Sequence, residues 1–134
     1  DEFKIDRLNG KFVSYGDRFY LFNMCNVTGK VPKGLVKEIF DKYPEANIYD
    51  KKRKLGDIIV KSNIINAITQ VSPLKAKEPN DSEEIRLNAF EETLNKIGKK
   101  YNDISIVFNE ISKEYNEKIE EFGRKNRNIK VYIV

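Results

Sequence analysis

Residues 19–44 read FYLFNMCNVTGKVPKGLVKEIFDKYP, and this segment carries the clearest pattern of strand, loop and helix in the chain. Its beginning, Phe19 to Phe22, is a short apolar and aromatic run, which is typical of a strand buried on both faces of a covered sheet. Its end, residues 35–43, carries apolar side chains at helical spacing, and Pro44 is placed to stop a helix. The segment therefore predicts a buried strand, a loop with two glycines and a helix.

This strand, loop and helix could bind an anion. A loop at the start of a helix offers backbone N–H groups and the positive end of the helix dipole, and both favour a phosphate. Gly29 and Gly34 would let the backbone come close to such a group. Because most units of this kind bind nothing, the pattern alone supports an anion site only as a hypothesis.

The rest of the chain alternates predicted strands and helices. A short strand within residues 3–8 runs into the turn signal Asn9-Gly10, and Ser82 is placed to cap a helix that Gly98 would end. Further elements are expected at residues 57–60, 63–69, 104–108, 111–122 and 129–134, with Gly123 ending the last helix. This order predicts an α/β fold, a three-layer α/β/α sandwich with a mixed central sheet of about six strands, and one domain over residues 1–134.

The composition excludes several kinds of chemistry. The sequence has no histidine and only one cysteine, so Ser-His-Asp and Cys-His nucleophiles, imidazole bases and zinc sites are not expected. We predict no metal and no cofactor. Cys25 lies within the apolar run and is expected to be buried and inert.

Charge and hydropathy point to a soluble protein. The 25 basic and 21 acidic residues leave a net charge of +4, which permits an anionic ligand without indicating a dedicated nucleic-acid binder. No segment approaches the roughly 18 apolar residues of a membrane span, and no signal peptide is recognisable. We expect a cytoplasmic, intracellular location and no membrane contact.

Three short motifs resemble those of the macro domains, which bind ADP-ribose and related nucleotides. Residues 22–26, Phe-Asn-Met-Cys-Asn, are similar to the Val-Asn-Ala-Ala-Asn of that family. From Asn26 to Pro44 the segment looks like a viral-type macro domain without a gap, and Ile65-Asn66-Ala67-Ile68 is similar to a strand in which the family often has Ile-His-Ala-Val. The order of elements also matches. The chain thus resembles a divergent, compact, viral-type macro domain.

The resemblance implies a crevice that binds ADP-ribose or a related phosphate-containing nucleotide. Asn23 and Asn26 would lie near the distal ribose, with Asn26 contacting its hydroxyls and, in an enzyme, placing a catalytic water. The loop from Gly29 to Leu35 would face the diphosphate. End-capping of the strand and loop is the alternative role for both asparagines. The residues implied to bind ligand are Asn23, Asn26, Gly29, Pro32, Lys33, Gly34, Leu35, Lys11, Phe12 and Asn109.

Several positions depart from the family pattern. Lys11 stands where an Asp commonly receives the adenine amino group, and Pro32-Lys33-Gly34 makes the first phosphate loop stiffer and more basic. Residues 109–113 replace a second glycine-rich loop and contain no glycine. Gln70 stands where one branch has a nucleophilic lysine, and an amide cannot take that role. Weak or no catalysis is therefore expected.

Two other functions remain open. The same pocket could act as an ADP-ribosyl hydrolase, with an ADP-ribosylated protein as partner, or as an ADP-ribose 1″-phosphate phosphatase, with Asn26 orienting water. Alternatively, the chain could be a non-enzymatic protein or nucleic-acid interaction module that uses Lys51, Lys52, Arg53 and Lys54. The glutamates of the two later helices are interpreted as solvated faces rather than as a catalytic pair.

Overall fold

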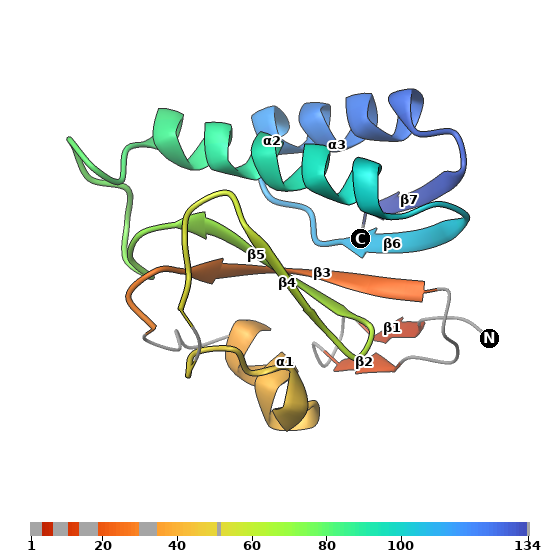
Figure 1. Ribbon diagram of the computed structural model, residues 1–134, viewed down its shortest axis with the longest axis horizontal. Helices are drawn as coiled ribbons and strands as arrows, with labels where there is room; N and C mark the ends of the chain where they lie inside the picture. Colours follow the sequence, from red (N-terminus) through yellow and green to blue (C-terminus); the bar gives the residue numbers. More distant parts are fainter. Residues whose placement is uncertain (1–3, 7–10, 14–18, 30–34, 51, 134) are drawn as a thin grey trace.

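The structure is a computed structural model that describes residues 4–6, 11–13, 19–29, 35–50 and 52–133. Within these residues the chain forms seven strands, three α-helices and one short 3₁₀ helix (Figure 1). The strands are β1 (Lys4–Asp6), β2 (Lys11–Val13), β3 (Phe19–Asn26), β4 (Ile58–Lys61), β5 (Ile64–Gln70), β6 (Ile104–Phe108) and β7 (Ile129–Ile133). The helices are α1 (Leu35–Lys42), η1 (Pro44–Ala46), α2 (Glu83–Lys100) and α3 (Lys113–Lys125).

The main sheet has five strands in the order β4-β5-β3-β6-β7. Strands β5, β3, β6 and β7 are parallel, and β4 is antiparallel to β5, so the sheet is mixed as predicted. Strands β1 and β2 form a separate antiparallel pair, so the expected number of about six strands in the main sheet was slightly too high. Segments close in sequence pair locally because a short link costs little closure entropy.

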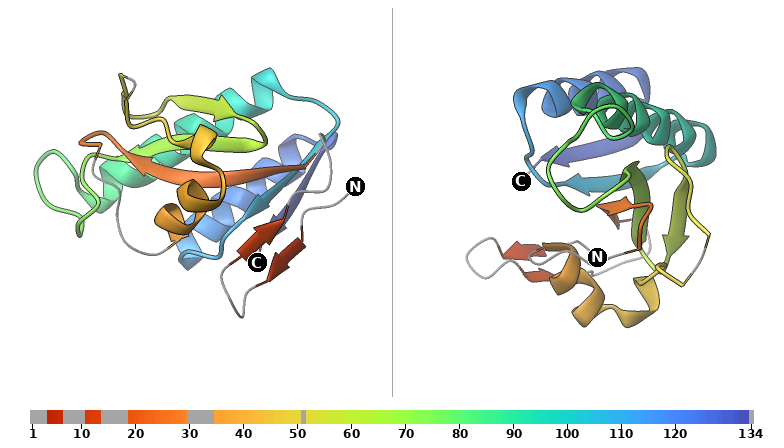
Figure 2. Two further views of the ribbon diagram at one scale, coloured as in Figure 1. Left: turned by 90° about the horizontal axis from the view of Figure 1, so that it is seen from below. Right: turned by 90° about the vertical axis from the view of Figure 1, so that its left-hand side faces the viewer.

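Helices cover both faces of the main sheet, which confirms the three-layer α/β/α arrangement (Figure 2). Leu21, Ile39, Ile48 and their neighbours form the core beneath α1. Phe22, Phe90, Phe108 and their neighbours form the core beneath α2 and α3. Strand β3 supplies both cores because successive side chains point to opposite faces, and it is therefore buried on both sides as its apolar composition predicted.

Two helices end later than their glycines suggested. Ser82 caps α2 as predicted, since its hydroxyl accepts a hydrogen bond from the Ile85 backbone N–H at 3.1 Å. Gly98 and Gly123, however, lie inside α2 and α3. A Cβ atom at Gly98 would lie 2.8 Å from Asn126 Oδ1, and one at Gly123 would lie 3.3 Å from Val131 Cγ2. Both glycines therefore serve close packing rather than helix termination.

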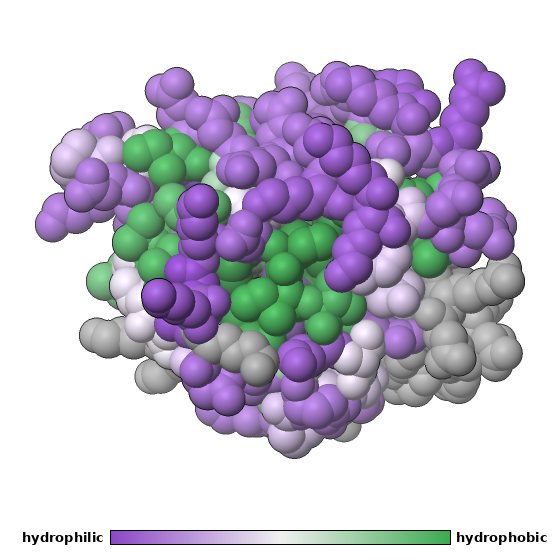
Figure 3. Space-filling view, viewed as in Figure 1, coloured by the Kyte–Doolittle hydropathy of each residue, from purple (hydrophilic) through white to green (hydrophobic). Residues whose placement is uncertain are grey.

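Strand β4 forms one edge of the main sheet, and all four of its residues are partly exposed. The space-filling view shows apolar residues gathered in the middle of this face, over β4 and β5 (Figure 3). Ile58 and Val60 pack from β4 against the core beneath α2. Among the described residues no helix combines the length and apolar character needed to cross a bilayer.

Candidate functional site

The carboxyl ends of β3 and β5 lie together at one edge of the main sheet. Asn26, at the end of β3, pairs with Gln70, at the end of β5. The connection from β3 leads to α1, and the connection from β5 leads through residues 71–82 to α2, so both emerge at the left side in Figure 1. Ligands of open α/β sheets bind at such an edge. The edge beside Asn26 is therefore the candidate site.

Asn26 organises the turn that leaves β3. Its side-chain Oδ1 accepts hydrogen bonds from the Gly29 backbone N–H at 2.8 Å and from the Thr28 hydroxyl at 3.0 Å. Its Nδ2 donates to the Tyr49 hydroxyl at 3.1 Å, and so does its backbone N–H at 3.2 Å. The residue is only 1% exposed. The Asn26 carboxamide thus closes the turn onto Thr28 and Gly29 and ties it to Tyr49.

The first amide groups of this turn are already bonded within the protein. The Val27 N–H donates to the Gln70 and Val71 carbonyls, and the Thr28 N–H donates to Val71 at 3.0 Å. Gly29 has a φ of +82°, a conformation that favours glycine, and it gives its N–H to Asn26. An anion would therefore have to find its donors further along the loop or at the beginning of α1.

Arg53 packs against this turn instead of projecting into solvent with the neighbouring lysines. Its Nε donates to the Asn26 carbonyl at 3.1 Å and its Nη2 donates to the Val27 carbonyl at 2.9 Å. Its Cζ lies 4.9 Å from the centre of the Tyr49 ring. A binding surface made of four equivalent cations is not what the geometry offers, since Arg53 is committed to the loop. Lys51 lies outside the described residues, whereas Lys52 and Lys54 are exposed.

Asn23 lies deeper, inside the sheet. Its Nδ2 donates to Asn66 Oδ1 across the β3–β5 pair at 2.9 Å, and Asn66 donates in turn to the Ala46 carbonyl at 3.0 Å. Asn23 is 2% exposed and Asn66 is 0% exposed. This buried amide pair is hydrogen-bonded within the protein, and it joins β3, β5 and η1 beneath the candidate site.

Cys25 lies beside this amide pair. Burial raises the pKa of its thiol to about 12, against smaller opposing effects of the Tyr49 hydroxyl and the Arg53 charge. We therefore expect no reaction with a thiol-specific disulfide reagent at pH 8 in the native protein, and reaction of one thiol per chain after denaturation. Following the released chromophore with and without urea measures both states, and rapid reaction of the native protein would contradict this burial.

The structure does not bring all the remaining predicted ligand residues to this edge, since β2, which contains Lys11 and Phe12, is drawn at the right in Figure 1, away from the carboxyl end of β3. The pairing of β3 with β6 ends at Leu21 and Val107, and Asn109 directly follows Phe108, the last residue of β6. Leu35 begins α1, and Lys11 and Phe12 lie in β2. Pro32, Lys33 and Gly34 lie outside the described residues.

The connection after β6 agrees with the short link expected there. Strand β6 ends at Phe108 and α3 begins at Lys113, so four residues join them. Ile111 within this link is 41% exposed. The chain therefore passes from Asn109 to α3 through a short link, with no long loop at the carboxyl edge of β6.

The connection after β5 contains a buried ion pair that sequence reasoning missed. Arg86 of α2 binds both carboxylate oxygens of Asp81, at 2.9 and 2.7 Å. Asp81 also accepts the Val71 and Ser72 backbone N–H groups, and Arg86 donates to the Ser72 and Leu74 carbonyls. The pair therefore holds the two ends of the loop of residues 71–81 together. Residues of this loop line an open, solvent-accessible hollow of about 300 Å³. The only sequence signal was an aspartate directly before the helix cap at Ser82.

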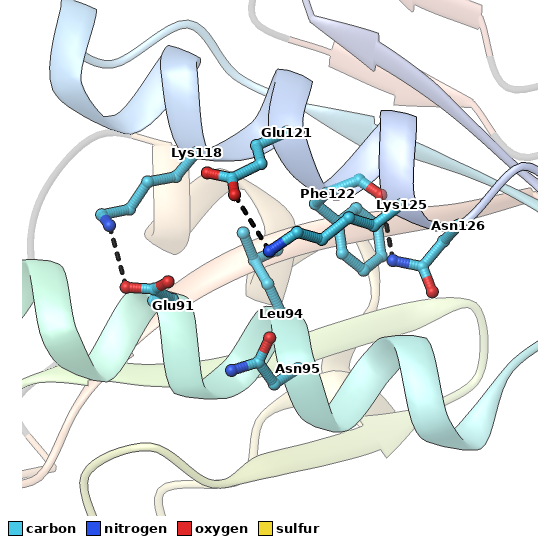
Figure 4. Close-up of a pocket in the computed structure, with 8 residues that line it drawn as sticks. All are labelled: Glu91, Leu94, Asn95, Lys118, Glu121, Phe122, Lys125 and Asn126. Carbon is cyan, nitrogen blue, oxygen red and sulfur yellow. Dashed lines mark hydrogen bonds and ion pairs between the residues drawn. The ribbon is translucent and has the colours of Figure 1, made fainter.

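The glutamates of α2 and α3 pair with lysines rather than with one another. Glu91 binds Lys118 at 2.8 Å across the two helices, and Glu121 binds Lys125 at 2.9 Å along α3 (Figure 4). The cleft that they line measures about 30 Å³, the size of one water molecule. This geometry agrees with solvated helix faces. Among the described residues, no group of three or more Cys, Asp or Glu side chains is arranged to hold a metal ion.

Several solved structures are similar to this fold. The macrodomain of Thermus aquaticus DarG is similar with a TM-score of 0.66 and 15% identity, over 87% of this chain and 95% of that chain. A macrodomain protein from Streptomyces coelicolor gives 0.63 and 17%, over 90% of each chain. The alphavirus P23pro-zbd gives 0.52 and 15%, over 87% of this chain and 19% of that one.

These similarities establish a macrodomain-like fold. They do not extend to the viral-type subclass, because bacterial and viral structures are both similar at comparable, low identity. No protein-family model and no curated protein sequence matches this chain.

Proposed function

We propose that the chain binds ADP-ribose, or a related nucleotide with phosphate groups, at the carboxyl edge of β3. The observation that carries this proposal is the rigid turn from Asn26 to Gly29, in a fold shared with macrodomains. Helix α1 follows this turn in the sequence, and the first N–H groups of a helix have no partner within the helix, so these groups and the helix dipole favour phosphate. The resemblance of residues 22–26 to the macro-domain motif supports the same ligand.

In this proposal the loop from Gly29 to Leu35, with Pro32, Lys33 and Gly34, faces the diphosphate. The resemblance assigns Lys11 and Phe12 to the adenine end and Asn26 to the distal ribose end, with Asn23 deeper in β3 and Asn109 directly after β6. Because the Asn26 carboxamide already bonds Gly29, Thr28 and Tyr49, we propose that it acts first by holding the turn in its binding shape. Lys11 in place of an acidic residue relaxes the preference for adenine.

Calorimetric titration with ADP-ribose, AMP and ATP tests the proposal directly. We expect ADP-ribose to bind with micromolar affinity, on the order of −8 kcal/mol, and AMP to bind more weakly because it lacks the second phosphate and the distal ribose. Heat signals absent for all three nucleotides, with a folded protein in the cell, would refute it.

Hydrolysis is the second candidate, and we expect it to be slow or absent. Gln70 stands at the position of the lysyl nucleophile, and its Nε2 donates to the Ser72 carbonyl at 2.6 Å. A hydrolase also needs preorganised donors at the charge that develops in the transition state, whereas the N–H groups of Val27, Thr28 and Gly29 are already bonded.

The measurement is product release from ADP-ribose 1″-phosphate and from ADP-ribosylated protein at high enzyme concentration. We expect less than one turnover per hour, a rate on the order of 10⁻⁴ s⁻¹ or below, which is far under the usual enzyme range. Multiple turnovers that disappear in the Asn26→Ala variant would instead establish a hydrolase.

A further inference from the structure

The guanidinium of Arg53 contacts both ends of the turn that follows β3. It donates to the Asn26 and Val27 carbonyls at the beginning of the turn, and its Nη1 reaches the Ile48 carbonyl at 3.5 Å. At the other end, a methyl group added to Gly29 would overlap Nη2 and lie 3.2 Å from Cζ. Arg53 therefore packs directly on Gly29 while it bonds the two residues that precede Thr28.

These contacts require a guanidinium rather than any positive charge. Two successive carbonyl oxygens match the fork of N–H groups on one planar side chain, and a plane can also stack on the Tyr49 ring. The ammonium of a lysine has three donors on a flexible stem, so it can neutralise the loop but cannot hold both carbonyls and the ring together.

Arg53 also completes a closed set of contacts around Asn26. Tyr49, on which the guanidinium stacks, accepts hydrogen bonds from the Asn26 backbone and side chain, and the Asn26 side chain bonds Gly29. Arg53 then bonds the Asn26 carbonyl. Fixing the carbonyls of Asn26 and Val27 fixes the planes of the next two peptides, and hence the direction in which the loop leaves β3.

We propose that Arg53 is a positioning residue for the turn from Asn26 to Gly29, which begins the loop proposed to face the ligand, and that its planar guanidinium, rather than its charge alone, sets the affinity for the phosphate-bearing ligand. This inference rests on the proposed function, since the ligand is bound at the same loop. Arg53 acts through Asn26, Val27 and Gly29 and need not touch the ligand. The role was hidden in the sequence because Arg53 lies in a run of four cations.

The test compares two substitutions of Arg53 with two substitutions of its exposed neighbours, using calorimetric titration with ADP-ribose. We expect Arg53→Lys to weaken binding about 10-fold, because a lysine loses one of the two charge-assisted hydrogen bonds that hold the turn. We expect Arg53→Ala to weaken binding about 100-fold, because an alanine loses both. Lys52→Met and Lys54→Met remove the same charge from the same segment, and we expect affinity within about twofold of the unsubstituted protein because exposed charges are screened.

Chemical rescue separates positioning from a general loss of stability. Methylguanidinium added to Arg53→Ala should restore a substantial part of the affinity by occupying the vacated position, whereas methylammonium at the same ionic strength should not. Hydrogen exchange of the Val27, Thr28 and Gly29 amides should accelerate in both Arg53 variants while that of Ile106 in β6 stays slow. Thermal melting followed by circular dichroism shows which variants are folded. If Arg53→Ala does not fold, the comparison of Arg53→Lys with Lys52→Met and Lys54→Met still tests the inference.

Each outcome bears on the inference. Wild-type affinity in Arg53→Lys, or an equal loss in Lys54→Met, would overturn it and leave ADP-ribose binding standing, because charge alone would then suffice. Rescue by both small cations would overturn it for the same reason. Failure of the unsubstituted protein to bind ADP-ribose would refute the proposed function, and the inference with it.

Discussion

Replacing Asn26 with alanine is expected to weaken ADP-ribose binding by at least about 100-fold, a change of roughly 2.7 kcal/mol. The substitution removes the carboxamide that bonds the Gly29 N–H and the Thr28 hydroxyl, and it leaves the Tyr49 hydroxyl with only the backbone N–H of residue 26. A polar group that loses its partner costs up to about 1–3 kcal/mol where it is shielded from water. The turn would then adopt other conformations, and the ligand would have to reorder it on binding.

Calorimetric titration of Asn26→Ala beside the unsubstituted protein measures this effect. Asn95→Ala is the matched control, because Asn95 is an exposed asparagine on α2, away from the carboxyl edge of β3. A second variant, Asn26→Asp, keeps acceptors for Gly29 and Thr28 but adds a negative charge, so it should keep the turn while repelling phosphate. Unchanged affinity in Asn26→Ala would remove Asn26 and its turn from the binding site.

The second large effect is on stability, at the pair of Asp81 and Arg86. Replacing Arg86 with methionine should lower the free energy of unfolding by about 3–5 kcal/mol, because it leaves a buried carboxylate without its cation. The Arg86 and Asp81 side chains are only 10% and 9% exposed, so most of the carboxylate is shielded from bulk water. Such a loss is a large fraction of the total stability of a domain this size. Urea denaturation at pH 7 measures it.

The double variant Asp81→Asn/Arg86→Met is the control for this prediction. It removes both charges, so it should recover part of the stability lost in Arg86→Met, and the difference reports the coupling between the two residues. Lys37→Met removes one partner of the exposed Lys37–Asp41 pair and should change stability by less than about 1 kcal/mol. Equal effects of Arg86→Met and Lys37→Met would show that the buried pair contributes nothing special.

The same pair predicts a dependence of stability on pH. Hydrogen bonds from Arg86, followed by those from the Val71 and Ser72 backbone, hold the pKa of Asp81 below its ordinary value in the folded protein. A carboxyl with a lowered folded pKa stabilises the protein above its unfolded pKa of about 3.9 and loses that contribution as the pH falls through the folded value. Stability should therefore drop below about pH 4, and less so in Asp81→Asn.

Local sequence determined the elements and their order. Alternation and β-branched content located β5, the helical spacing of residues 35–43 located α1, and the Ser82 cap located the beginning of α2. These predictions succeeded because each depends on residues within one or two turns of each other. The prediction that Gly98 and Gly123 end their helices failed for the opposite reason. Each glycine leaves room for a residue outside its own helix, Asn126 beside Gly98 and Val131 beside Gly123.

The contacts at the candidate site join residues that are far apart in the sequence. The sequence singled out Asn26 and Gly29, but only parallel pairing of β3 with β5 brings Val71 to their loop, and only the path of the chain after η1 brings Tyr49 and Arg53 to Asn26. Hydrogen bonds between residues 23 to 44 positions apart leave no periodic pattern in a sequence. The helices and strands of this protein therefore follow from its local sequence. The shape of the turn after β3 follows from contacts that exist only once β3 and β5 have paired and residues 49 and 53 have packed beside them.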